Sequence, residues 1–141
     1  MSDTFYPGFG EMLPEINELN APFWEGLAQG EFRLLRCGGC GAHQYPPESF
    51  CYECGSRDLS WVAVEGKGTV YSYIIVHQVY HKAFKPFVPY TVAIVQLDEG
   101  PRMLTAMLEL NRTIAIGDRV KPLIRHVDGE RAFLSYVPER D

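Results

Sequence analysis

The four cysteines of the chain constrain its fold more than any other feature. They form two Cys-x2-Cys pairs that are separated by ten residues: Cys37, Cys40, Cys51 and Cys54. Such a pair turns tightly enough for both sulfurs to face one point, and two pairs supply the four thiolates of a tetrahedral zinc site. Gly41 and Gly55 follow the second cysteine of each pair, where the backbone often needs a positive φ. We therefore predict a zinc ribbon that holds one structural Zn²⁺.

Other uses of these cysteines fit the pattern less well. Disulfides are unusual in a reducing compartment, and redox-active Cys-x2-Cys motifs do not normally come as two facing pairs. A four-thiolate iron site remains the chemical alternative.

A closed site with four ligands has no open position for water, so the metal is expected to have no catalytic role. It also uses every thiol in the chain and leaves none as a nucleophile.

Net charge bears on the class of partner. The chain carries 18 acidic and 13 basic residues, a formal net charge of −5, and 46% of its residues are hydrophobic. This composition supports a folded core. The first 36 residues hold six acids against two bases. An acidic chain without a basic stripe is not attracted to phosphate backbones, so we expect no nucleic-acid partner.

The N-terminus lacks the basic and apolar regions of a signal peptide, and no stretch approaches 18 apolar residues. We therefore expect no membrane association and a cytoplasmic location.

A short helix is predicted over residues 19–30. Asn20 is a plausible N-cap, Pro22 fits the first turn, and Gly30 stands where a helix ends. The apolar residues share one helical face: Phe23, Trp24, Leu27 and Ala28. That face either packs on its own domain or docks on a partner subunit, and the pattern leaves both interpretations open.

The rest of the chain alternates between strand and turn signals. Strands are predicted at five β-branched or alternating segments: 69–80, 90–98, 102–110, 119–127 and 132–137. Five strands with no helix between most of them favour a small OB-fold barrel, because closure removes exposed edges. We predict a mainly β protein with an N-terminal arm and helix at 1–31, a rubredoxin-like zinc ribbon at 32–60 and the barrel at 61–141.

The loop 81–90 is the main candidate for ligand contact. It joins two lysines to aromatic residues and two prolines, so Lys82, Lys85 and Phe87 are candidates to contact a phosphate-bearing, partly apolar ligand or a partner protein. An ordinary barrel loop would also fit. His77 and His81 lie on a strand and loop without nearby carboxylates, so we expect exposed histidines and no second metal site.

Two further segments have structural interpretations. Gly66-Lys67-Gly68 lacks the helix and third glycine of a nucleotide fingerprint, and a bulge at the entry to the barrel is expected there. Tyr71 and Tyr73 resemble stacking platforms for bases, but their alternation with other strand residues favours packing in the core and across strands.

Several segments resemble a known family of small bacterial and archaeal proteins, long called a domain of unknown function. Its members have an N-terminal helix, a rubredoxin-like zinc ribbon and a C-terminal OB-fold. The resemblance covers residues 20–138 and includes FWEGLAQGEFRLLRCGGCG, CYECGS, GKGTVYSY, PYTVAIVQLDEGPR and IGDRV. The acidic arm at 1–18 lies outside it.

The resemblance implies a role beside enzymes of acyl-CoA metabolism, including β-oxidation and steroid or lipid side-chain degradation. Family members pair with thiolase-like proteins, which include acyltransferases and retro-aldolases, and some pair with MaoC-like enoyl-CoA hydratases. The member lacks the catalytic cysteine and helps to form the acyl-CoA pocket. The zinc cysteines carry over directly, and no catalytic residue does.

The leading hypothesis is a non-catalytic accessory subunit of a thiolase-superfamily enzyme, in a hetero-oligomer that acts on acyl-CoA. The helix at 20–29 and the loop 81–90 would then supply contact surface, with Lys82, Lys85 and Phe87 in contact with CoA or the partner and the two lysines near the CoA phosphates. A hydratase partner is the alternative, and a nucleic-acid-binding OB module is the rival from another class.

Overall fold

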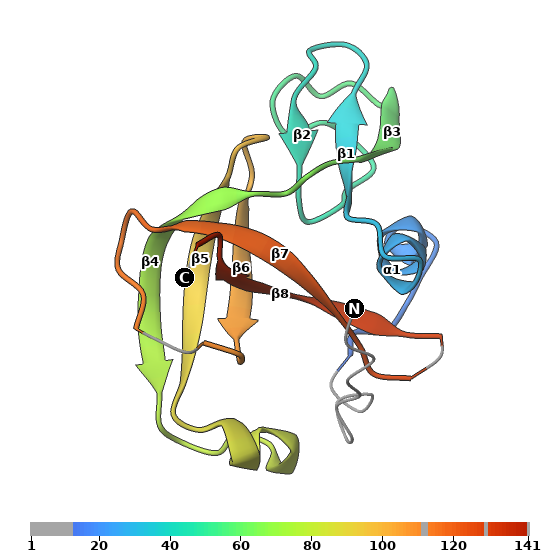
Figure 1. Ribbon diagram of the computed structural model, residues 1–141. Helices are drawn as coiled ribbons and strands as arrows, with labels where there is room; N and C mark the ends of the chain where they lie inside the picture. Colours follow the sequence, from blue (N-terminus) through green and yellow to red (C-terminus); the bar gives the residue numbers. More distant parts are fainter. Residues whose placement is uncertain (1–12, 111–112, 129, 141) are drawn as a thin grey trace.

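The computed structural model describes residues 13–110, 113–128 and 130–140. It holds a short α-helix, a 3₁₀ helix and eight strands: α1 Ala21–Ala28, β1 Arg33–Cys37, β2 His43–Gln44, β3 Leu59–Ala63, β4 Gly68–Val76, η2 Lys82–Phe87, β5 Tyr90–Leu97, β6 Arg102–Met107, β7 Arg119–His126 and β8 Ala132–Pro138. A small three-stranded ribbon stands at one end of a larger sheet, and α1 lies beside the region where the two meet (Figure 1). The predicted class, mainly β with an N-terminal helix, zinc ribbon and OB-fold, is confirmed.

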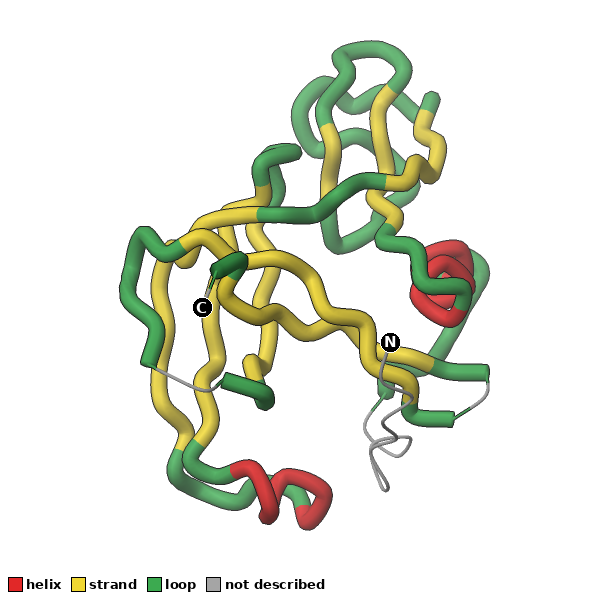
Figure 2. The backbone as a smooth tube through the Cα atoms, in the orientation of Figure 1, coloured by secondary structure: helices red, strands yellow, loops and turns green. Residues whose placement is uncertain are grey.

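The larger sheet is the predicted five-stranded barrel. Its strand order is β6-β5-β4-β7-β8, with antiparallel neighbours throughout, and it curls so that the two outer strands approach each other (Figure 2). The hydroxyl of Ser135 on β8 donates to the carbonyl of Ala106 on β6 at 2.8 Å. This bond links β6 and β8, between which no strand pairing is found among the described residues. All five predicted strands are present, but the first ends at Val76 because a loop and η2 follow it.

Helix α1 ends as its sequence predicts and begins differently. The N–H of Gly30, at φ +82°, donates to Leu27, and the N–H of Glu31 donates to Gly26, which is the Schellman pattern. Asn20 is the N-cap residue, but its side chain makes no capping bond. Its Oδ1 accepts instead from the N–H of Asn17 at 2.8 Å, because a turn at 17–20 precedes the helix.

One apolar core runs from the helix through the ribbon into the barrel. It contains Phe23 and Leu27 of α1, Leu34 of β1, and barrel residues such as Val95 and Tyr136. The Phe23 ring lies 5.1 Å from Tyr45 and 6.5 Å from Trp61, both in the ribbon. The helical face therefore packs against its own chain, as the first of the two interpretations expected.

The barrel entry corrects two predictions. The register shift in the β4–β5 ladder lies between Val70 and Ser72, not at the two glycines before them. Tyr71 and Tyr73 are not core residues, since 48% and 37% of their surfaces are exposed. The Arg102 guanidinium lies 3.9 Å from the centre of the Tyr71 ring. Tyr71 therefore packs against a side chain of β6 on the outer face of the barrel and not in its core. The bulge turns Tyr71 out of the inward alternation.

Candidate metal centre and its surroundings

The two cysteine knuckles repeat the same backbone design. The N–H of Cys37 donates to the carbonyl of Ala42 at 2.9 Å, and the N–H of Cys51 donates to Ser56 at 2.8 Å. In each knuckle the glycine after the second cysteine donates to the carbonyl of the first cysteine, at 2.9 Å. Gly41 and Gly55 have φ of +79° and +78°, a conformation that side chains with a Cβ rarely adopt. The predicted need for glycine at both positions is confirmed.

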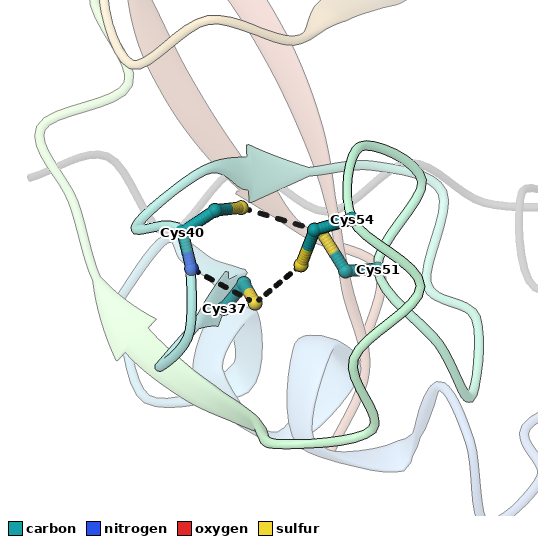
Figure 3. A group of neighbouring side chains, drawn as sticks. All are labelled: Cys37, Cys40, Cys51 and Cys54. Carbon is teal, nitrogen blue, oxygen red and sulfur yellow. Dashed lines mark hydrogen bonds between the residues drawn. The ribbon is translucent and has the colours of Figure 1, made fainter.

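The four sulfurs meet between these knuckles (Figure 3). The Sγ atoms of Cys37 and Cys54 lie 3.6 Å apart, as do those of Cys40 and Cys51. All four ligand atoms lie within 4.8 Å of one another. A zinc tetrahedron with Zn–S bonds of about 2.3 Å has sulfur–sulfur edges of about 3.8 Å. The observed separations fit that tetrahedron, and the four cysteines can hold one Zn²⁺.

Backbone N–H groups prepare the first cysteine of each knuckle to bind metal. Those of Cys40 and Gly39 point at Cys37 Sγ, the latter at 3.3 Å, and they lower the pKa of this thiol to about 6, although burial acts the other way. The N–H groups of Cys54 and Glu53 likewise lower the pKa of Cys51. Because zinc binds the thiolate, the lower pKa of these two thiols favours loading near neutral pH. At Cys40 and Cys54 a backbone N–H also lowers the pKa, but the neighbouring sulfurs and burial together raise it.

The site has the character of a structural metal centre. Cys37 and Cys51 are buried, while Cys40 and Cys54 reach the surface. All four ligands come from one short segment, and the strands of the ribbon are only two to five residues long. Cys37 ends β1, and the other three cysteines lie in turns and loops. Zinc would supply the cross-link that such a small sheet lacks. No other metal-ligating cluster occurs among the residues that the structure describes.

The predicted contact residues lie far from the cysteines. Lys82, Lys85 and Phe87 belong to η2, at the opposite end of the molecule from the ribbon (Figure 1). Both lysines are exposed and Phe87 is half-buried. At the start of η2, His81 Nδ1 accepts a hydrogen bond from the N–H of Ala83 at 3.0 Å. His77 is exposed, as expected, whereas His81 is half-buried.

A buried junction below the ribbon was not foreseen. Gly66, at φ +69°, accepts from the Tyr136 hydroxyl at 2.7 Å and donates to the Glu99 carboxylate at 3.2 Å. A Cβ on Gly66 would lie 2.2 Å from the Phe32 ring. Burial, and then the nearby Glu99 charge, raise the pKa of Tyr136, so this hydroxyl stays a donor. The first glycine of GKGTVYSY is therefore a packing requirement.

Sequence reasoning also missed an apolar groove of about 240 Å³ between α1, η2 and the barrel. Its walls include Trp24, Phe84, Leu104, Leu108 and Phe133. These residues come from α1, η2 and two separate segments of the barrel and share no local pattern, so only the fold brings them together.

Comparison with known proteins identifies the family. Residues 24–60 match the description "ChsH2, rubredoxin-like zinc ribbon domain", and residues 61–125 match "ChsH2, C-terminal OB-fold domain". A "DUF35 domain-containing scaffold protein" of Methanocaldococcus jannaschii is 31% identical over 106 residues, which are 72% of this chain and 74% of the relative. The chain belongs to the DUF35 family. Its ribbon is a rubredoxin-like zinc ribbon with four cysteines positioned for one metal ion, so the zinc prediction is confirmed.

Two other relatives carry enzyme names. A "Probable enoyl-CoA hydratase alpha subunit" of Thermomonospora curvata is 41% identical over 95 residues, which are 67% of this DUF35 chain but 29% of that subunit. The chain therefore spans less than a third of that relative. A solved structure named "Ltp2-ChsH2(DUF35) aldolase" has a TM-score of 0.78 at 36% identity, and the likeness covers 89% of this chain and 98% of that one.

None of the described helices is long and apolar enough to cross a bilayer.

Proposed function

We propose that this DUF35 chain is a non-catalytic accessory subunit of an enzyme that acts on acyl-CoA, with a thiolase-superfamily protein as its partner. One observation carries the proposal: all four cysteines of the chain gather in the metal cluster. A thiolate that is bound to structural zinc is not available for thioester exchange. The nucleophilic cysteine and its general base would therefore come from the partner.

The names of the relatives support a scaffolding role. The same ribbon and barrel occur in a hydratase α subunit, in an aldolase complex and in proteins named as scaffolds. A hydratase and an aldolase catalyse different reactions. A role in holding subunits together therefore explains the shared ribbon and barrel better than a common catalytic step does. The aldolase structure is named for two components, Ltp2 and ChsH2(DUF35), which supports a hetero-oligomer.

The groove and η2 suggest how the chain contributes to an acyl-CoA pocket. Phe84 of η2 lines the apolar groove, and Lys82 and Lys85 stand exposed on the same 3₁₀ helix. A CoA thioester joins an acyl group to a phosphorylated carrier, so an apolar wall beside two ammonium groups is complementary to it. We propose that the groove contacts the acyl part of the substrate. Lys82, Lys85 and Phe87 then lie where the partner subunit, with the CoA that it holds, meets this chain.

A MaoC-like hydratase partner is the second candidate, favoured by the 41% identity with the hydratase α subunit. Nucleic-acid binding is less well supported, because the net charge of −5 repels phosphate backbones. Reduced zinc thiolates also fit a cytoplasmic location, which we include in the proposal.

Co-expression tests the proposal. The chain would be produced with a thiolase-superfamily protein and, separately, with a MaoC-like hydratase from the same genome, and each pair would be purified through a tag on the enzyme. We expect stable co-purification and an enzyme that is more active or more soluble with the chain than without it. If neither enzyme binds the chain, and both are fully active alone, the proposal is wrong.

A further inference from the structure

The outer face of the barrel is unusually apolar over β4, β5 and β6. On β5, four residues are buried and point inward: Thr91, Ala93, Val95 and Leu97. The alternate residues Tyr90, Val92, Ile94 and Gln96 point outward, and three of these four are apolar. Register places Ile74, Val92 and Ala106 in one outward row. Antiparallel barrels normally place polar residues on the solvent side. Strand β5 instead has apolar residues on both faces, which is typical of a strand that is covered on both sides.

Strand β7 of the same barrel follows the usual rule. Val120 is fully buried, and the positions that alternate with it are Arg119, Lys121, Leu123 and Arg125. Three of these four outward residues are charged. The apolar outer face is therefore confined to one side of the barrel, and overall composition does not explain it.

The exposed residues continue to the tip of the β4–β5 hairpin. Large apolar side chains are exposed here to between 37% and 73% of their surface: Tyr71, Tyr73, Ile74, Ile75, Val79 and Tyr80. Figure 1 shows this hairpin extending beyond the point where β7 crosses the barrel. At the tip, the Phe84 ring of η2 stacks on the Tyr90 ring of β5, with 4.9 Å between the ring centroids. Register places Tyr73 and Ile75 opposite the inward-facing Ala93 and Thr91, so these two lie on the other face of the hairpin from Ile74. Exposed apolar side chains gathered on one hairpin mark interaction sites on soluble proteins.

Charge is segregated onto the same hairpin. Residues 66–97 contain three lysines, Lys67, Lys82 and Lys85, and no acidic residue, whereas the rest of the chain holds 18 acids against ten bases. Lys67 pairs with Glu139 at 3.1 Å. Among the described residues, no carboxylate pairs with Lys82 or Lys85. An apolar surface with a positive rim is complementary to an apolar surface with a negative rim.

From these observations we propose that the outer face of β4–β6 and the hairpin tip form the docking surface for a partner protein whose contact face is apolar at its centre and acidic at its rim. This inference rests on the proposed function and identifies the surface through which the enzyme subunit is held. The large aromatic and aliphatic side chains of the hairpin would form its buried centre.

A second copy of the chain fits this surface less well than an acidic partner. A two-fold contact would place the same patch on both sides and bring Lys82 and Lys85 toward their equivalents. Like charges across an interface oppose association, and no acidic residue in 66–97 offsets them.

The test uses the complex that co-expression yields. Ile74→Asp and Tyr80→Asp would be compared with Ile116→Asp, a change of the same kind at a residue that is 67% exposed in the loop before β7. We expect the hairpin variants to weaken binding at least about tenfold and the control less than about threefold. Ile74→Lys should weaken binding less than Ile74→Asp, and the affinity should fall as salt rises. Circular dichroism of each variant would verify that the fold is intact.

The outcomes separate this inference from the proposed function. If the wild-type chain binds an enzyme and both hairpin variants bind it equally well, the docking surface is wrong while the proposed function stands. If sedimentation shows that the isolated chain is a dimer which Ile74→Asp dissociates, a second copy covers the face and the acidic partner is wrong. If no enzyme subunit binds the wild-type chain, both proposals fail.

Discussion

The ribbon and the barrel of this DUF35 chain are stabilised in different ways. The ribbon is a sheet of three short strands whose loops converge on four sulfurs. The barrel has a continuous apolar interior, in which Val95, Val120 and Tyr136 are fully buried. A metal site contributes its binding energy only while all its ligands are in place, whereas a core loses stability in proportion to what is removed. We therefore expect the substitution of one metal ligand to unfold the ribbon completely. A substitution in the barrel core should lower the free energy of unfolding in proportion to the side-chain volume that it removes.

The largest expected effect is the loss of one zinc ligand. Cys51→Ser should release the metal and unfold the ribbon, because structural zinc contributes about 10–16 kcal/mol of apparent binding energy in small domains. The complex with the partner should be lost as well. Two-dimensional NMR would follow this, with signals from β1 and β3 expected to collapse while those from β5 and β8 remain dispersed. Ser49→Ala, an exposed change near the same knuckle, should bind zinc normally. Normal partner binding by metal-free Cys51→Ser would contradict the account.

Removing the Phe23 ring should have the next largest effect, and it tests how separate the two regions are. Phe23 touches Phe32, Tyr45 and Trp61 and joins the barrel core, so Phe23→Ala should cost about 3–5 kcal/mol. Denaturant unfolding would measure the loss. Phe50→Ala, at a residue that is 42% exposed, should change stability little. If Phe23→Ala were equally mild, the helix would not belong to the shared core.

Gly66→Ala should have a smaller but clear effect at the junction of ribbon and barrel. The new Cβ would meet the Phe32 ring at 2.2 Å, and the φ of +69° disfavours a side chain. We expect a loss of about 2–4 kcal/mol in thermal unfolding from overpacking and backbone strain together. Gly30→Ala is the matched control, because its φ of +82° is similar but no atom lies within 4 Å of its Cβ. Equal losses in the two variants would show that packing against Phe32 contributes nothing.

The smallest effect belongs to the ion pair on the barrel surface. Arg119 donates to both carboxylate oxygens of Asp98, at 2.8 and 2.7 Å, and this contact lowers the pKa of Asp98. A lowered pKa in the folded state adds stability above the ordinary value for aspartate, which is lost as pH falls through the lowered value. Both side chains are about half exposed, so Asp98→Asn should change stability little near neutral pH. Melting curves at pH 7 and pH 3 would check this, and the variant should depend less on pH than wild type. A large loss at pH 7 would mean that the pair is more than a surface contact.

How far the sequence predicts the structure also differs between the two regions. The zinc site follows from four residues and two glycines, because metal geometry dictates spacing within each knuckle. The barrel strands are predictable from alternation, but the end of the first strand at Val76 is not, since the β-branched pattern continues past it. The exposure of Tyr71 was missed because a single-residue bulge reverses the inward and outward positions. The Gly66 junction depends on Phe32, Glu99 and Tyr136, which no local pattern connects.

Metal analysis combined with X-ray absorption spectroscopy tests the central claim most directly, because the account requires a closed metal site and no chemistry at that site. The purified chain should contain one zinc per molecule, with four sulfur neighbours at about 2.3 Å and no oxygen or nitrogen ligand. Iron in place of zinc, or a metal with three sulfurs and a water, would contradict the account. An open coordination position would give the metal a catalytic role that an accessory subunit does not need.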